Sequence, residues 1–194
     1  MYDPLMCGRY SITTNPEAMR RLFAFMGPTP NLEPRYNAAP TQPLPVIRLD
    51  KQGERRLAAL RWGLVPSWAD DVKVGARMIN ARAETVEKNA SFRNAFQRRR
   101  CLVPADGFYE WHASKEGRLP WRFTMKDGEP FAFAGLWEFW KKQDQVVESF
   151  TIIVTEANAL VGRIHDRMPV ILDPANYGDW LSAADPAVLR ALLK

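Results

Sequence analysis

Between residues 44 and 155, hydrophobic residues alternate with polar ones or form short continuous runs, which is the pattern of β-strands. The turn sequences "DKQG" and "KDGE" (126–129) interrupt these runs, and the second is the clearest hairpin turn in the chain. The sequence "RMPVIL" near the C-terminus predicts one more strand. The predicted strands are 44–49, 55–65, 101–104, 107–112, 119–125, 131–139 and 148–155.

Helical signals lie near both ends of the chain and in parts of the middle. Asn15 is a good N-cap, Pro16 suits the first helical turn, and Gly27 favours a C-terminal stop. Asp185 and Pro186 predict the start of a final helix in the same way. One or two short helices are expected within 81–100 and another near 156–163.

Many strands with few helices, and no regular alternation of the two, indicate an α+β fold. We expect a mainly antiparallel, barrel-like sheet with peripheral helices. The 194 residues suit one domain with a substantial core. Residues 28–45 and 66–80 are expected to be loops, and neither an internal repeat nor a domain linker interrupts the chain.

The composition excludes few classes of function. The chain has 46% hydrophobic residues and a formal net charge of +5, an ordinary globular composition with a mild preference for polyanionic partners. Its two Cys and two His show no zinc-ligand spacing, and no apolar run approaches the roughly 20 residues that span a bilayer. We expect no metal, no cofactor, no membrane association, a monomer, and the reducing cytoplasm, where a thiol stays free.

Two motifs carry candidate proton-transfer groups. "LVPADGFYEWH" places Glu110 among aromatic residues, which would raise the pKa of a carboxyl and suit it for proton transfer. A solvent-facing glutamate at a strand edge explains the motif equally well. "GRIHDRMPVIL" places His165 beside Asp166 between two arginines. A lone histidine is more often structural than functional, and the clustering with charged residues narrows that preference.

The motif "MINARAET" places Asn80 and Arg82 two residues apart. On an extended segment both side chains face the same way, so an amide and a guanidinium can address one ligand. The alternative is a turn asparagine beside a solvated arginine.

Aromatic and basic residues are interleaved, as they are in grooves that bind single-stranded nucleic acid. Trp68 and Trp111 flank loop-like segments and are the better stacking candidates. The run "RRR" at 98–100 is interpreted as a solvated charge run. Three further tryptophans lie in strand-like runs and are expected in the core: Trp62, Trp121 and Trp137.

The stretch "PLMCGRY" places Met6 directly before Cys7. Translation from Met6, followed by removal of that methionine, would leave a terminal cysteine with an amine and a thiol on neighbouring carbons. Self-cleavage between Met6 and Cys7 is the second route to the same terminus. The other cysteine, Cys101, is expected to be a buried and inert strand residue.

Taken together, these motifs resemble the SRAP (SOS response-associated peptidase) family from about residue 6 to residue 182. The motifs, in the family's order, are "MCGRY", "RYNAAPTQ", "RWGLVPSWA", "INARAET", "RRCLVPADGFYEW", "FAGLWE", "FTIIVTEAN" and "IHDRMPVIL". The resemblance implies one SRAP domain over 7–194 that crosslinks covalently to abasic sites in single-stranded DNA and protects them during replication or repair. It implies a cytoplasmic protein, associated with the nucleoid when bound to DNA, and a proposed autoproteolysis that exposes Cys7.

The resemblance also assigns roles to individual residues. The α-amine of Cys7 would attack the aldehyde of an open abasic site, and its thiol would then close a thiazolidine ring. Glu110 and His165 would move protons, and Asn80 would orient the amine or the sugar. The DNA contacts fall to Arg82, Trp68 and Trp111.

Two features depart from the family pattern. "MYDPL" precedes "MC", and an internal Cys7 has no free amine, so residues 1–6 are expected to be non-native or removed. The chain also ends at "LRALLK", before the C-terminal segment into which family members usually continue. Neither departure touches the matched residues.

Two other functions stay open from the sequence. A thiol peptidase could use Cys7 as nucleophile, His165 as base and Glu110 as orienting group, since triads are assembled in space and not in sequence. A non-covalent single-stranded DNA-binding module could use the same aromatic and basic residues, and its complex would be salt-labile and lost on denaturation.

Overall fold

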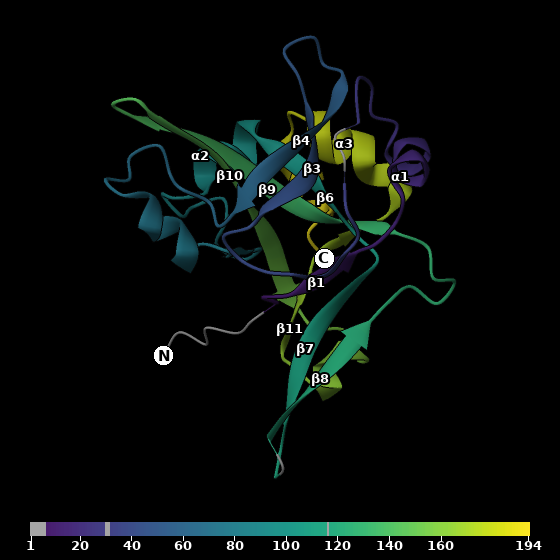
Figure 1. Cartoon of the computed structure of the whole chain (residues 1–194). Helices are drawn as coiled ribbons and strands as arrows, with labels where there is room; N and C mark the ends of the chain where they lie inside the picture. The colour runs from purple at the N-terminus through teal and green to yellow at the C-terminus, as the bar shows by residue number, and fades with distance from the viewer. Residues whose placement is uncertain (1–6, 30–31, 116) are drawn as a thin grey trace.

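Five strands close into a barrel in the upper part of Figure 1. The computed structural model describes residues 7–29, 32–115 and 117–194. Within the ring each strand pairs with two neighbouring barrel strands, and the path β10–β4–β3–β6–β9 returns to β10. The barrel strands are β3 (Pro43–Leu49), β4 (Arg55–Trp62), β6 (Arg100–Ala105), β9 (Phe131–Lys142) and β10 (Gln145–Glu156).

The number of barrel strands explains its one parallel pairing. A ring with an odd number of strands cannot alternate in direction all the way round, so at least one neighbouring pair must be parallel. Here β4 and β10 are parallel, through Arg61 opposite Ser149 and Trp62 opposite Phe150, and the other ring pairings are antiparallel. The prediction of an α+β fold with a mainly antiparallel, barrel-like sheet is confirmed.

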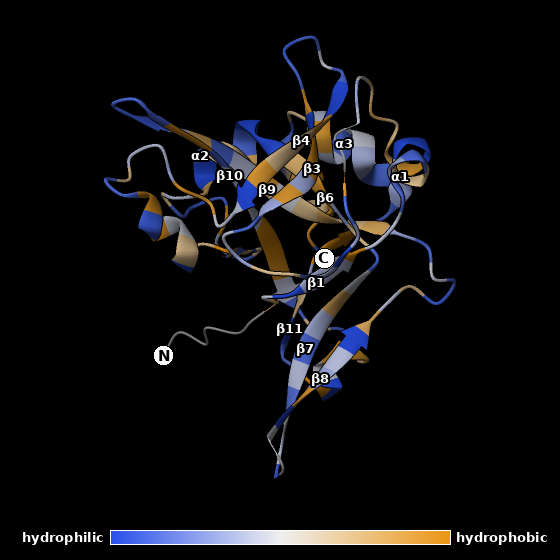
Figure 2. Ribbon diagram, in the orientation of Figure 1, coloured by the Kyte–Doolittle hydropathy of each residue, from blue (hydrophilic) through white to orange (hydrophobic). Residues whose placement is uncertain are grey.

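Aromatic side chains fill the barrel, whose strands carry most of the hydrophobic colour in Figure 2. The rings of Trp62 and Phe150 stack with centroids 6.3 Å apart. Tyr10, on a short outer strand, packs edge-on against Trp62 and Phe133, with ring centroids 5.2 and 5.8 Å away. That short strand is thereby anchored to the barrel core.

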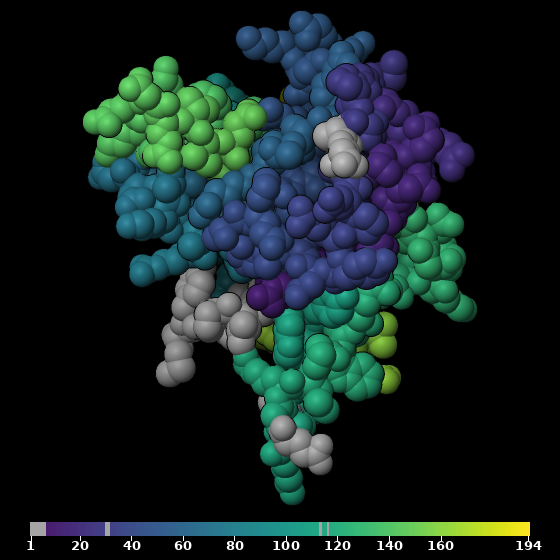
Figure 3. Space-filling view, viewed as in Figure 1, coloured from purple at the N-terminus to yellow at the C-terminus, as the bar shows by residue number. Residues whose placement is uncertain are grey.

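A smaller sheet carries the outer strand and a long hairpin. Its order is β2 (Arg35–Ala38), β1 (Tyr10–Ile12), β7 (Gly107–Ser114) and β8 (Gly117–Phe123). The β7–β8 hairpin projects away from the barrel in Figures 1 and 3. Its outer part is largely polar, as the blue and white ribbon of Figure 2 shows.

Short helices and strands surround the barrel. Helices α2 (Arg93–Arg98) and α3 (Tyr177–Ser182) pack on the outside of β6. Three short strands pair with two of the barrel strands. β5 (Asn80–Arg82) and β11 (Arg167–Pro169) pair with β10, and β12 (Ile171–Leu172) pairs with β9. The remaining helices are α1 (Pro16–Phe23) and α4 (Pro186–Ala191), with 3₁₀ turns at Val72–Arg77, Val161–Arg163 and Pro174–Asn176.

The first helix ends earlier than its sequence predicts. Asn15 caps it as expected, accepting a hydrogen bond from the N–H of Ala18 at 2.9 Å. The helix then stops at Phe23, because Ala24 adopts a left-handed conformation with φ of 52°. Ala24 therefore provides the C-terminal stop that was predicted for Gly27. The guanidinium of Arg20 holds the following turn by donating to the carbonyl oxygens of residues 25 and 27.

The prediction of a hairpin at "KDGE" is wrong. A turn is present, with the N–H of Gly128 donating to the carbonyl of Met125 at 3.1 Å, but it joins β8 to β9. These two strands belong to different sheets, because β9 already has β6, β10 and β12 as partners.

Several smaller predictions also need correction. Residues 28–45 contain β2 and the start of β3, and residues 66–80 contain a 3₁₀ turn. Within 81–100 the described structure has one α-helix, in line with the one or two expected, and near 156–163 it has a 3₁₀ turn in place of the predicted helix. The final helix begins as predicted, with Asp185 accepting from the N–H of Ala187 at 2.7 Å, and α3 precedes it without having been predicted.

Candidate functional site

The pairing of β1 with β7 determines where Cys7 lies. Tyr10 pairs with Phe108, Ser11 pairs with Gly107, and the N–H of Tyr109 donates to the carbonyl of Arg9 at 3.0 Å. Because the two strands are antiparallel, the chain before Arg9 runs alongside the residues after Tyr109. Cys7 therefore lies beside Glu110. Met6 and the peptide that precedes it lie outside the described residues.

Three distant segments of the chain meet at Cys7. Its backbone N–H donates to Oε1 of Glu110 at 2.8 Å, and its Sγ lies 3.9 Å from the carbonyl oxygen of Arg167. Cys7 is 3% exposed and Glu110 is 1% exposed. The φ of Cys7 is 44°, in the left-handed region that non-glycine residues rarely adopt outside turns and functional sites.

The thiol of Cys7 is held in its protonated form. Burial raises its pKa well above the ordinary value, and the charge and hydrogen bonding of Glu110 and the charge of Asp166 raise it further. A thiolate is the stronger nucleophile. The buried thiol is therefore a weak nucleophile in this structure, and the backbone nitrogen of the same residue contacts the Glu110 carboxylate.

His165 reaches the same region through its neighbour Arg167. The backbone N–H of Arg167 donates to Nδ1 of His165 at 3.0 Å, and Oδ1 of Asp166 lies 3.2 Å from the same nitrogen. The carbonyl of Arg167 faces the Cys7 thiol, and its guanidinium pairs with Glu84. One residue thus links His165, Cys7 and the segment that follows β5.

Asn80 and Arg82 lie on β5 with the alternation that the sequence predicts. Ala81 between them is buried, Asn80 is half-buried and Arg82 is exposed. Strand β5 pairs in parallel with β10, with Arg82 opposite Val154, and β11 pairs with the same residue through Pro169. The two motifs "NAR" and "HDRMP" therefore flank the same end of β10.

The candidate stacking residues lie in different places. Trp68 is 60% exposed in the loop after β4, and Trp111 is half-buried within β7, not in a loop. Trp111 follows Glu110 directly, so its side chain points to the other face of the hairpin.

Of the three tryptophans predicted for the core, Trp62 is a core residue. Trp137 is half-buried under the guanidinium of Arg48, which lies 4.1 Å from the ring centroid. The core prediction for Trp121 is wrong, because this side chain is exposed.

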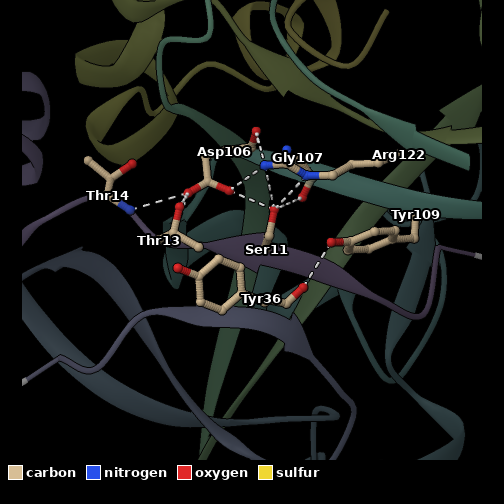
Figure 4. Close-up of polar contacts among 8 residues, drawn as sticks. All are labelled: Ser11, Thr13, Thr14, Tyr36, Asp106, Gly107, Tyr109 and Arg122. Carbon is tan, nitrogen blue, oxygen red and sulfur yellow. Dashed lines mark hydrogen bonds and ion pairs between the residues drawn. The ribbon is translucent and has the colours of Figure 1, made fainter.

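A carboxylate ties β1 to the hairpin that carries Glu110 (Figure 4). Oδ1 of Asp106 accepts from the Ser11 hydroxyl at 2.6 Å and from Nη2 of Arg122 at 3.1 Å. Oδ2 accepts from the hydroxyl and N–H of Thr13 and from the N–H of Thr14. Gly107 allows Arg122 this approach, since a Cβ there would lie 2.7 Å from its Nε. Asp106 thereby fixes the alignment that brings Cys7 to Glu110.

We expect Asp106→Asn to lower the free energy of unfolding at neutral pH by about 1–3 kcal/mol, the usual cost of impairing a buried charged hydrogen-bond acceptor. Burial by itself raises the pKa of Asp106, but the hydrogen bonds from Ser11 and Thr13 and the charge of Arg122 outweigh it, so the pKa lies below its ordinary value. A lowered folded-state pKa stabilises the fold above the unfolded pKa of about 4, and this stability is lost as the pH falls through the folded value.

Urea denaturation across the acid range checks this prediction. Wild type should lose stability steeply below about pH 4, and Asp106→Asn should decline less, so the two curves converge in acid. Asp144→Asn, at an exposed carboxylate, is the matched control. Parallel curves for wild type and Asp106→Asn would contradict the assignment.

The run "RRR" is not a solvated charge run. Arg98 is exposed, but Nη1 of Arg99 pairs with the buried Glu138 at 2.7 Å. Arg100 is 6% exposed and donates only to backbone carbonyls in the contacts described. Cys101 is buried as predicted, and burial raises the pKa of its thiol.

Sequence reasoning did not identify three residues that the structure places around the site, namely Arg167, Asp106 and Trp121. Arg167 and Asp106 each lie inside a motif that was singled out, and their contacts are with residues far away in sequence.

Among the described residues, no group of three or more His, Cys, Asp or Glu could hold a metal ion. None of the helices there has the length and apolar character of a membrane span.

The model of the family described as SOS response associated peptidase (SRAP) matches residues 6–194, and the chain belongs to this family.

Named relatives and solved structures agree with that assignment. The chain is 41% identical over 196 residues to "Abasic site processing protein YoqW" of Bacillus subtilis, covering 97% of this chain and 87% of the relative. It is 29% identical to "Abasic site processing protein YedK" of Escherichia coli, covering 91% and 79%. An X-ray crystal structure of a protein from Bacteroides thetaiotaomicron superposes with a TM-score of 0.86 at 26% identity, covering 97% and 87%.

Proposed function

We propose that this protein captures abasic sites in single-stranded DNA by forming a covalent thiazolidine link through Cys7. The relatives named as abasic site processing proteins supply the substrate class. The observation that carries the proposal is the 2.8 Å contact between the nitrogen of Cys7 and the carboxylate of Glu110. In a chain that begins at Cys7, this nitrogen is an α-amine.

The first step is imine formation. An abasic site in its open form carries an aldehyde, and an α-amine has an ordinary pKa of roughly 7.7–8.0, so part of it is neutral near neutral pH. Glu110 takes the proton from the ammonium form. The neutral amine adds to the aldehyde carbon, and one of its protons passes to the oxygen to give the carbinolamine. Glu110 returns its proton to the carbinolamine hydroxyl, and water leaves as the protonated imine forms.

The second step closes the ring. The Cys7 sulfur adds to the carbon of the protonated imine, Glu110 takes the thiol proton, and the product is a five-membered thiazolidine whose nitrogen keeps the imine proton. Amine and thiol sit on neighbouring carbons, so closure is intramolecular and strongly favoured. The protonated thiol does not compete with the amine for the aldehyde, which gives the two steps an order.

The remaining site residues take supporting roles in this proposal. His165 acts as a second acid or base during sugar ring opening and crosslink reversal. Asn80 orients the amine or the sugar. Arg82, Trp68 and Trp111 contact the strand through phosphates and bases, in keeping with the exposed positions of Arg82 and Trp68.

The proposal requires the bond before Cys7 to be absent. Translation from Met6 followed by removal of methionine supplies the terminus, and self-cleavage between Met6 and Cys7 is the second source. A general thiol peptidase is less well supported, because burial and Glu110 keep the Cys7 thiol protonated and its Sγ faces a carbonyl oxygen.

The test mixes the protein with a single-stranded oligonucleotide bearing one abasic site and resolves the products on a denaturing gel. A chain that begins at Met6, checked by intact mass for loss of that methionine, should attach. The same protein acetylated at its terminal amine should not. Attachment that survives acetylation would overturn the proposal, and a complex lost on denaturation would favour simple binding.

Two variants sharpen this test. Cys7→Ser keeps the amine but lacks the thiol, so it should give no stable product unless borohydride reduces the imine. Cys101→Ser, at the buried second cysteine, should attach like wild type.

A further inference from the structure

The β7–β8 hairpin carries an exposed tryptophan, Trp121, in contrast to the buried Trp62 of the barrel. Trp121 is 52% exposed, although it lies within a strand. In the β7–β8 ladder it stands directly opposite Glu110. Directly opposite residues of an antiparallel pair point to the same face, with Cβ atoms about 4.5–5.5 Å apart. An exposed indole therefore adjoins the carboxylate that holds the Cys7 nitrogen.

A second apolar residue extends this exposed surface. Leu119 lies two residues before Trp121, so it shares the same face, and it is 47% exposed opposite the exposed His112. Together Trp121 and Leu119 form a strip, the "hairpin strip", that leads from Glu110 toward the hairpin tip. Trp111 lies on the opposite face, so the strip is a separate surface.

The surroundings of the hairpin strip favour a planar, anionic partner. Strand β8 is at the edge of its sheet, and Pro120 at its centre has no N–H to offer to an added strand. Exposed His112 stands opposite Leu119 on the face of the strip, exposed Arg118 points to the other face of the same strand, and the chain as a whole is basic. Aromatic faces next to positive charge are the elements with which proteins bind single-stranded nucleic acid.

We propose that Trp121 stacks on the nucleobase that adjoins the abasic sugar, and thereby positions that sugar at Cys7. This inference rests on the proposed function and names a subsite of it. A base next to an abasic site has lost its stacking partner on one side, so the indole opposite Glu110 can replace the missing base. Trp121 would thus favour binding of strands in which one base is missing. It would contribute selectivity for abasic sites without touching the reacting atoms.

The test measures binding without chemistry. The probes are fluorescein-labelled oligonucleotides containing one tetrahydrofuran residue, an abasic analogue that has no aldehyde. In two matched probes the base on the 5′ or the 3′ side of this residue is also missing. Binding is measured by anisotropy for wild type, Trp121→Ala and Trp121→Phe. Phe139→Ala removes an exposed aromatic from the barrel and is the control.

Trp121→Ala should weaken binding to the single-gap probe by about five- to tenfold or more, and Trp121→Phe should restore most of it. The loss should disappear on one of the two double-gap probes, which identifies the strand direction. An equal loss on all three probes, or no loss, would overturn the proposal, as would dimerisation of wild type that Trp121→Ala abolishes. Urea denaturation confirms that the variants are folded.

The same probes separate this inference from the proposed function. If wild type discriminates the probes as expected but forms no crosslink with a true abasic site, the chemistry fails and the subsite stands. If wild type crosslinks normally and Trp121→Ala binds and crosslinks equally well, the subsite fails and the chemistry stands.

Discussion

Glu110→Gln is expected to slow covalent capture by about 10²–10⁴-fold while leaving the fold intact, the range that a positioned proton-transfer group contributes. The glutamine oxygen can still accept the hydrogen bond that the Cys7 nitrogen now donates at 2.8 Å. It cannot take a proton from the α-ammonium or return one to the carbinolamine hydroxyl. Single-turnover rates at saturating oligonucleotide, measured on denaturing gels with a chain that begins at Cys7, check this.

The Cys7 thiol gives an independent measurement in the same variant. Glu110 raises the pKa of this thiol through its charge and its hydrogen bond, and burial contributes the largest part. Removing the charge should therefore speed alkylation of Cys7 by iodoacetamide at a given pH, even as capture slows. Capture at the wild-type rate would contradict the role of Glu110, and so would a slower capture that is fully explained by weaker binding of the oligonucleotide.

The main strands could be predicted from the sequence because their alternation is local. Residues 44–49 and 131–139 follow the pattern of barrel strands and match β3 and β9 within a few residues. The closure of the barrel and the failure of the "KDGE" hairpin could not be predicted. Both depend on which strands pair across the fold, and β9 is occupied by partners far from it in sequence.

The candidate site was predicted as a set of residues, and the structure describes how two of them meet. Cys7 contacts Glu110 because the register of β1 against β7 places them together. His165 reaches Cys7 through the backbone of Arg167, a contact that no local pattern encodes. Trp121 was assigned to the core because strand patterning does not reveal that β8 is an edge strand of a projecting hairpin.

The second large effect concerns Arg100, the last residue of "RRR". Its Nε donates to the carbonyl of Trp180 at 2.5 Å and its Nη2 to that of Ala183 at 2.7 Å, at the end of α3. Its Nη1 donates to the carbonyls of Phe96 and Gln97, both at 2.7 Å, in the last turn of α2. A helix leaves its last carbonyls without partners in the helix, and this one guanidinium satisfies them at two helices at once.

Arg100→Leu is expected to lower the free energy of unfolding by about 3–5 kcal/mol, because it leaves several buried carbonyls without donors. The charge itself is costly to bury, and burial lowers the pKa of Arg100, but the four hydrogen bonds depend on its planar fork. Arg100→Lys should recover only part of the loss, since an ammonium cannot reach both helix ends. Urea denaturation measures these changes, with the exposed Arg98→Leu as the matched control, expected to stay within about 0.5 kcal/mol of wild type.

The salt dependence of DNA binding separates this structural role from a phosphate contact. An arginine that contacts a phosphate contributes about one unit to the slope of log affinity against log salt. Because the guanidinium of Arg100 is directed at carbonyls at the ends of α2 and α3, the folded fraction of Arg100→Leu should keep the wild-type slope. A slope reduced by about one unit, with stability unchanged, would instead place Arg100 on the DNA. Weakened capture in this variant should therefore follow its unfolded fraction, and Glu110→Gln should show the converse, a folded protein that cannot transfer the proton.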